Sequence, residues 1–271
     1  MSETAMYTAG ILVEDKNYAK KSDIKLKALK ILVFIFAIIL VVEVVVYLIF
    51  MPLYSSVDIF FTGQTNFTET QLRSMCGTEI EQPWINFNTE NVVMNLSQNY
   101  SIESVIVEKR FPDKVFVQIY ERIPVAATLV SIDDKTVSVQ IDKNGVLFSM
   151  DERIPNENIP LITGLAFDGK IEGTRLHRKL RPIAEQIATI QKSNPSYFSV
   201  ISEIRVIPKE YDNYDLMVYP VQYHTRVLTD RNLSLESLQY MMIVLDVIDK
   251  LEENVKEVDL RYGSVSYKTV L

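Results

Sequence analysis

The sequence predicts an α+β protein with a single N-terminal transmembrane helix followed by two domains. Three observations support this: an apolar run from Ile31 to Met51, a β-α-α-β-β pattern in residues 52–123, and a mixed, mainly antiparallel β pattern with two helices in residues 124–271. The 220 residues after the run are enough to form two modest hydrophobic cores.

The apolar run is long enough to cross a membrane. At a rise of 1.5 Å per residue, about twenty helical residues cover a hydrocarbon core of roughly 30 Å. Lipid offers the backbone no hydrogen-bonding partner, so such a segment is stable there as a helix. The alternative is a cleaved signal peptide, but the run is too long for one and no A-x-A-like site follows it. We therefore expect an uncleaved anchor.

The flanking charges predict the direction of this anchor. Residues 1–30 contain six lysines, whereas the first Lys or Arg after the run is Arg73. By the positive-inside rule, residues 1–30 form a cytoplasmic tail and residues 52–271 lie on the far side of the cytoplasmic membrane. Residues 1–15 show no period and are expected to be disordered. Residues 16–30 can continue the membrane helix.

Glu43 is the one charged residue inside the apolar run. A carboxylate facing lipid is costly, so an acid at this depth often contacts another transmembrane helix or marks a function. The alternative is that Glu43 is protonated or reaches water at the outer interface. The sequence leaves both open, and Glu43 is kept as a candidate intramembrane contact.

Residues 52–123 contain the elements of a complete two-layer domain. Alternating runs predict the strands, and a T-x-x-Q capping box predicts the start of the first helix. The expected elements are strand Ser56–Thr62, a helix from Thr68, helix Asn88–Asn99, and hairpin strands Ser104–Arg110 and Lys114–Glu121.

Residues 124–271 are expected to form a second, mainly β domain. One amphipathic helix covers about Thr174–Lys192, and Pro182 requires that it start late or be kinked. Ser234 can cap a second amphipathic helix. The expected strands are Val125–Val130, Thr136–Ile141, Val146–Ser149, Ile159–Gly164, Ile201–Ile207, Tyr214–Tyr219, Val255–Leu260 and Ser264–Leu271.

Composition argues against several functions. Residues 52–271 hold 22 basic and 30 acidic side chains, a poor composition for binding nucleic acid. Cys76 is the only cysteine, so no intramolecular disulfide forms, and its apolar neighbours favour a buried thiol. His177 and His224 lie outside any metal-binding motif. We expect no metal and no cofactor.

The chain also lacks the local signatures of catalysis. It contains no G-x-S-x-G, Walker, G-x-G-x-x-G or HExxH motif. We therefore expect neither enzymatic activity nor a small-molecule substrate.

Several motifs occur in the order of a known family. They are Val57–Gly63 (VDIFFTG), Pro83–Phe87 (PWINF), the V-x-V-x-R-x-x-P and V-x-E-R-x-P-x-A spacing in 105–126, the D-x-x-G-x-x-F turn at Asp142, and Val258–Tyr262 (VDLRY). With the single span before them, they resemble the FtsQ/DivIB cell-division proteins. The resemblance implies a POTRA domain at 52–123 and a β domain with a C-terminal interaction strand at 124–271.

The resemblance also implies a noncatalytic divisome scaffold, enriched at the septum. Its partners would be FtsL-like and FtsB/DivIC-like bitopic coiled-coil proteins and other divisome components, which it would link to septal peptidoglycan synthesis. The family's main contact adds a partner strand to an edge of the β domain. The residues expected to form this contact are Asp259, Arg261, Tyr262, Ser264, Val265, Ser266, Tyr267 and Lys268.

The residues agree with such a contact, and they leave alternatives. Ser264–Leu271 alternates in polarity and can leave backbone groups unpaired, or it can be covered by its own domain. Arg261 can orient a partner carboxylate or pair with Asp259. The second hairpin strand, Lys114–Glu121, is a weaker candidate for accepting a partner.

The alternative function is a POTRA-type chaperone or transport component of the envelope. That class predicts repeated POTRA modules or a following transmembrane barrel. The sequence shows one POTRA-like block, and the strands after it are interrupted by amphipathic helices.

Overall fold

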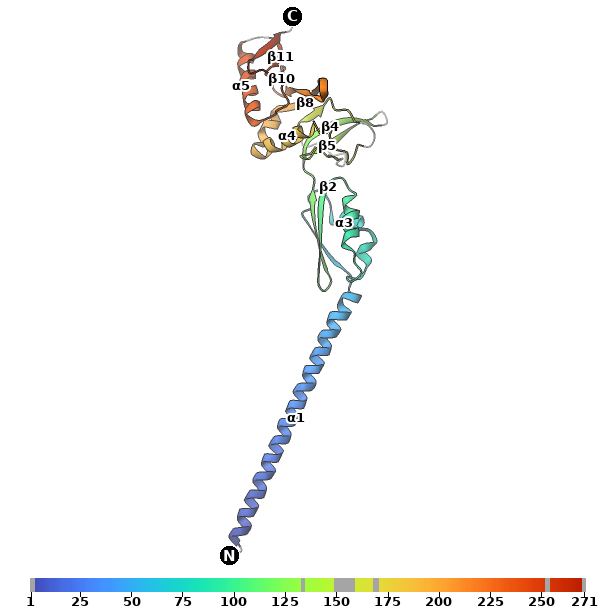
Figure 1. Cartoon of the computed structure of the whole chain (residues 1–271), viewed down its shortest axis with the longest axis vertical. Helices are drawn as coiled ribbons and strands as arrows, with labels where there is room; N and C mark the ends of the chain where they lie inside the picture. Colours follow the sequence, from blue (N-terminus) through green and yellow to red (C-terminus); the bar gives the residue numbers. More distant parts are fainter. Residues whose placement is uncertain (1–2, 133–134, 149–158, 168–170, 252–253, 270–271) are drawn as a thin grey trace. The chain divides into compact units, whose positions relative to one another are not determined.

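A long helix begins the chain in the computed structural model, which describes residues 3–132, 135–148, 159–167, 171–251 and 254–269. Helix α1 runs without a break from Glu3 to Tyr54 (Figure 1). Its segment Lys25–Tyr54 has a mean hydropathy of 3.2 and is long and apolar enough to cross a membrane. This agrees with the predicted anchor.

The helix extends further toward the N-terminus than we expected. Of residues 1–15, predicted to be disordered, those from Glu3 onward are helical. The segment before the apolar run contains no proline, and adding residues to an existing helix avoids the cost of a new nucleus. The continuation of α1 through residues 16–30 is confirmed.

A three-stranded sheet with two helices follows. Its elements are β1 (Asp58–Thr62), α2 (Glu69–Cys76), a 3-10 turn η1 (Gly77–Glu81), α3 (Thr89–Ser97), β2 (Ile102–Arg110) and β3 (Lys114–Glu121). The strand order is β1-β3-β2. This confirms the predicted β-α-α-β-β order.

Local chemistry explains these elements. Thr68 and Gln71 form the expected capping box, with Thr68 N donating to Gln71 Oε1 at 2.9 Å and Gln71 N donating to Thr68 Oγ1 at 3.3 Å. Alternate residues of β3 are buried, as the period of a half-buried strand requires. The side chain of Cys76 is buried, as predicted.

From Pro124 onward, the described residues form a nine-stranded mixed sheet with two helices. The strands are β4 (Pro124–Ile132), β5 (Lys135–Asp142), β6 (Leu147–Phe148), β7 (Leu161–Thr163), β8 (Ile201–Pro208), β9 (Tyr214–Pro220), β10 (Arg226–Thr229), β11 (Val255–Asp259) and β12 (Ser266–Thr269). The order is β12-β11-β10-β9-β8-β7-β4-β5-β6. Most pairs are antiparallel; β4–β7, β7–β8 and β10–β11 are parallel.

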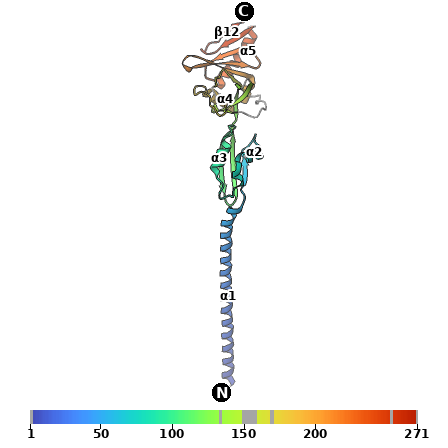
Figure 2. The same cartoon turned by 90° about the vertical axis from the view of Figure 1, so that its right-hand side faces the viewer.

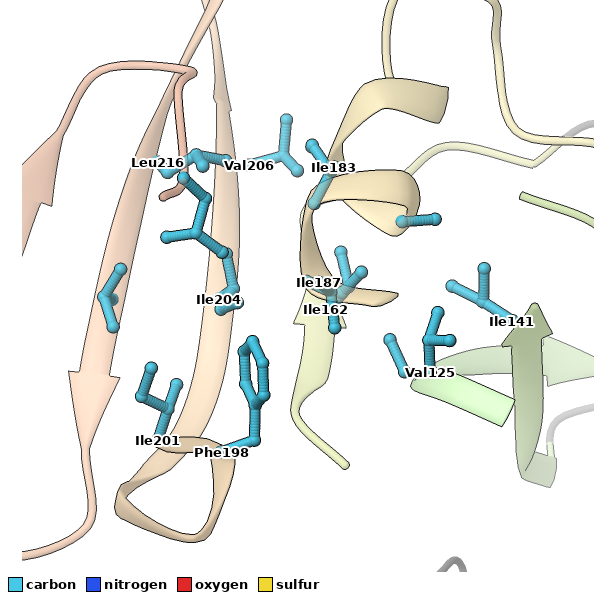
Figure 3. Packing of buried hydrophobic residues seen from close by; sticks show 14 of the residues in the cluster. Val125, Ile141, Ile162, Ile183, Ile187, Phe198, Ile201, Ile204, Val206 and Leu216 are labelled. Carbon is cyan, nitrogen blue, oxygen red and sulfur yellow. The ribbon is translucent and has the colours of Figure 1, made fainter. Parts of the chain in front are cut away.

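Helix α4 (Arg181–Ser193) packs its apolar side on this sheet. Ile183 and Ile187 are fully buried and face sheet residues such as Ile162 and Ile204 (Figure 3). The helix starts later than Thr174, with Pro182 in its first turn, where the missing N–H costs no helical hydrogen bond. The late start, one of the two alternatives, is therefore correct.

Helix α5 (Leu235–Leu251) supports the C-terminal end of the sheet. Ser237 N donates to Ser234 Oγ at 3.1 Å, so Ser234 caps the helix as predicted. Val244 and Ile248 of α5 form a small core with Val255 and Val258 of β11. Strand β10, which lies beside β11, was not predicted. It has only four residues, too few for a clear alternating pattern.

Candidate partner interface

The C-terminal strand β12 lies at one end of the nine-stranded sheet (Figure 2). It pairs antiparallel with β11, with Val258 opposite Tyr267 and Asp259 opposite Ser266. Within the described residues, no strand pairs with its other side. Such an edge presents backbone hydrogen-bonding groups to a partner chain.

The side chains around this edge are exposed as well. Every residue from Tyr262 to Thr269 is exposed. Three of them are large apolar or aromatic residues, Tyr262, Val265 and Tyr267, with exposed fractions of 75%, 41% and 47%. Of the predicted strand Ser264–Leu271, the last two residues lie outside the described part of the chain. Among the described residues, β12 is an edge strand with exposed side chains, and its pairing with a partner strand stays a prediction.

An ion triad ties β12 to its neighbours. The Glu257 carboxylate on β11 receives Lys268 Nζ at 2.8 Å and Arg226 Nη2 at 2.8 Å. Glu257 is only 8% exposed, and hydrogen bonding from Lys268 is the main cause that lowers its pKa. This triad crosses strands β10, β11 and β12. The triad therefore fastens β12 to β11. Within the described residues, the edge of β12 that faces away from β11 has no paired strand.

A second network, centred on Arg261, shapes the turn between β11 and β12. Its guanidinium makes two bonds to Asp259, Nε to Oδ1 at 2.9 Å and Nη2 to Oδ2 at 2.5 Å, and a third from Nη1 to Asp215 Oδ2 at 2.6 Å. Lys209 also binds Asp215, at 2.5 Å. The Arg261 hydrogen bond lowers the pKa of the Asp259 carboxyl, and that carboxyl raises the pKa of Arg261.

Within the domain, Arg261 makes the pairing with Asp259 that was one of the two roles considered for it. Its guanidinium pairs with Asp259 and Asp215 inside the domain, and its carbon Cζ lies 5.0 Å from the Tyr262 ring centroid. Arg261 therefore stabilises the turn that carries Tyr262. Gly263 follows with a φ of 69°, a left-handed conformation that glycine adopts without strain.

The structure brings the predicted site residues together at one edge and adds four that sequence reasoning missed. Asp259, Arg261 and Lys268 are the charged members of the predicted set, and each bonds to a partner within the domain. The missed partners are Lys209, Asp215, Arg226 and Glu257. Glu257 and Asp215 were detectable as acids inside apolar strand patterns.

The weaker candidate, strand Lys114–Glu121, is contradicted. This strand is β3, the middle strand of the order β1-β3-β2. Both of its edges are already paired, so it cannot accept a further strand. The edge strands of this sheet are β1 and β2.

Glu43 lies on the surface of α1. The membrane-spanning window of that helix is 0% buried by the described chain. No intramembrane partner for Glu43 is described, and its contact with a second transmembrane helix stays a prediction.

Comparison with known families identifies the three-stranded domain. Residues 57–122 match the POTRA domain of the FtsQ type. The chain thus carries a POTRA domain after an N-terminal helix that is long and apolar enough to cross a membrane. No curated protein matches it. The POTRA match and the N-terminal apolar helix together fit a bitopic protein of the FtsQ/DivIB type, which confirms the resemblance and the fold class.

Proposed function

We propose that the protein is a noncatalytic divisome scaffold that binds FtsL-like and FtsB/DivIC-like bitopic proteins by strand addition to β12. The FtsQ-type POTRA domain and the apolar helix support a membrane protein with a role in cell division. The open outer edge of β12 is the observation that carries the mode of binding. Main-chain hydrogen bonds to such an edge supply affinity, and side chains beside it supply specificity.

The exposed face of α5 gives a coiled-coil partner a second surface. Tyr240, Ile243, Val247 and Leu251 are exposed apolar residues spaced by three or four positions along the helix. This spacing places them on one stripe, which adjoins the side that packs on β11 through Val244 and Ile248. A helix of a bitopic partner can pack on the stripe while its following segment pairs with β12.

Co-purification from detergent-solubilised membranes tests this function. Proline at Ser266 removes a backbone N–H and fixes φ at the start of β12. We expect Ser266→Pro to lose the small bitopic proteins that co-purify with the wild type. Thermal unfolding of both proteins shows whether the sheet is intact.

A matched pair of tyrosines separates contact from general surface effects. Tyr262 lies in the turn before β12 and has an exposed fraction of 75%. Tyr211 lies in a different turn and has an exposed fraction of 91%. We expect Tyr262→Ala to weaken partner binding roughly tenfold, or ~1.4 kcal/mol, and Tyr211→Ala to leave it unchanged. Recovery of the same partners with every variant would contradict binding at β12. Absence of bitopic partners from the wild-type preparation would contradict the scaffold function.

A further inference from the structure

The end of the membrane helix is bonded directly to a loop of the POTRA domain. Ile85 N donates to Pro52 O at 3.1 Å, and Trp84 N donates to Ser55 O at 3.4 Å. Ser56 and Pro83 also form an isolated antiparallel bridge. These bonds hold the Pro83–Ile85 loop beside the last turn of α1, at the end of the segment that is long and apolar enough to cross a membrane.

This loop and the tip of the β2–β3 hairpin expose apolar side chains. Ile85 is 50% exposed, and Phe111 at the hairpin tip is 48% exposed. Trp84 joins the two: its ring meets Phe111 edge-on at a centroid distance of 6.0 Å, and its Nε1 donates to Lys114 O at 3.1 Å. The tip of the hairpin is therefore fixed to the loop that is fixed to the membrane helix.

Basic side chains accompany this aromatic cluster. Lys109 Nζ lies 4.4 Å from the Trp84 ring centroid and donates to Phe87 O at 3.1 Å. Arg110 and Lys114 lie over the rings of Phe116 and Phe60, at 4.6 Å and 5.8 Å. Acidic Glu108, which pairs with Arg110 at 3.3 Å, balances part of this charge. Long basic side chains of this kind cover apolar surface with their stems and place the charge in a polar layer.

We propose that this cluster, Trp84, Ile85 and Phe111, docks into the headgroup layer of the bilayer that α1 spans. Trp and other aromatic side chains with neighbouring Lys and Arg favour the membrane–water interface, because their apolar bodies and polar tips match its two sides. Ile85 and Phe111 would leave water for the boundary with the acyl chains. The docking would restrict how the POTRA domain tilts on its anchor.

Trp84 is the only tryptophan in the chain, so its fluorescence reports on this site alone. The experiment compares the full-length protein in phosphatidylcholine nanodiscs with and without bromine atoms high on the acyl chains. We expect the brominated lipid to remove about half of the Trp84 emission, as for an interfacial side chain. Retained emission would overturn the proposal.

Two substitutions to aspartate separate docking of the loop into the headgroup layer from simple tethering of the domain by α1, because α1 anchors every variant alike. We expect Ile85→Asp to lose most of the quenching, because a carboxylate resists entry into the headgroup–acyl boundary. Met94→Asp puts the same charge at an apolar site of similar exposure, 59%, on α3, and we expect wild-type quenching. Equal quenching in both variants would overturn the proposal. Ile85→Ser replaces Ile85→Asp if thermal unfolding shows that the aspartate disrupts the domain.

Discussion

The two edges of the nine-stranded sheet differ in whether the chain itself covers them. At the β6 end, Leu147 N donates to Thr174 O and Gly173 N donates to Leu147 O, both at 2.8 Å, and both strand residues are buried. At the β12 end, every strand residue is exposed and no described strand pairs with the outer side. The fold therefore covers one edge with its own chain and leaves the other available for pairing.

The largest expected contrast comes from truncating one side chain at each edge. Leu147 is fully buried, so Leu147→Ala should lower the free energy of unfolding by about 2–5 kcal/mol. Tyr267→Ala on β12 should lower it by less than about 1 kcal/mol, because this side chain is 47% exposed. Urea unfolding of the two variants measures both values. Equal losses would mean that β12 belongs to the core of the fold.

Removal of Arg261 should have the next largest effect. Arg261→Ala removes the guanidinium from Asp259 and leaves the buried Asp215 with Lys209 alone, and we expect a loss of roughly 2–3 kcal/mol. Arg205 is a suitable control, since it pairs with Glu203 at 3.1 Å but is 50% exposed. Arg205→Ala should cost less than about 1 kcal/mol. A loss from Arg261→Ala as small as this would show that the turn does not depend on the network.

The pKa of Glu257 gives the β12 edge a dependence on pH. Because this pKa is lower in the folded protein than its ordinary value of 4.5, the stabilisation is complete above that value. It is lost as the pH falls through the lower folded pKa. We expect the protection of β12 amides, corrected for the pH dependence of intrinsic exchange, to fall as the pH drops below 4.5, and Glu257→Gln to remove its share of this dependence. Identical pH profiles for wild type and Glu257→Gln would contradict this role.

Lys268→Ala should have the smallest effect. The Lys268 side chain is 78% exposed, and Arg226 still pairs with Glu257 in its absence. We expect a loss of stability of 0 to about 1 kcal/mol, measured by thermal unfolding. Arg226→Ala, which removes the less exposed partner, should cost more. The reverse order would mean that Lys268 is the principal anchor of the strand.

Periodicity and capping chemistry allowed most of the fold to be predicted. The strands of the β2–β3 hairpin alternate clearly, and the Thr68 and Ser234 caps define helix starts. The short strand β10 could not be predicted, because four residues hold too little periodicity. The middle position of β3 was also missed, since a sequence pattern predicts that a strand exists but not which strands become its neighbours.

The candidate site was predictable to a similar degree. Alternation at the C-terminus predicted a strand there, and the interval between the predicted strands Val255–Leu260 and Ser264–Leu271 falls within the observed turn. The partners of Arg261 and Lys268 were not predictable, because Asp215 lies 46 positions from Arg261 and meets it only when the sheet forms. Long-range ion pairs depend on strand order, which local sequence does not specify.

Hydrogen exchange at the two sheet edges tests the central claim most directly. The full-length protein in detergent is compared with and without the extramembrane segment of an FtsB/DivIC-type partner. Strand addition predicts that backbone amides in Ser266–Thr269 exchange at least roughly tenfold more slowly with the partner bound, while those of Leu147 and Phe148 stay unchanged. A bound partner that leaves β12 exchange unaltered would contradict the assignment of this strand as the binding edge.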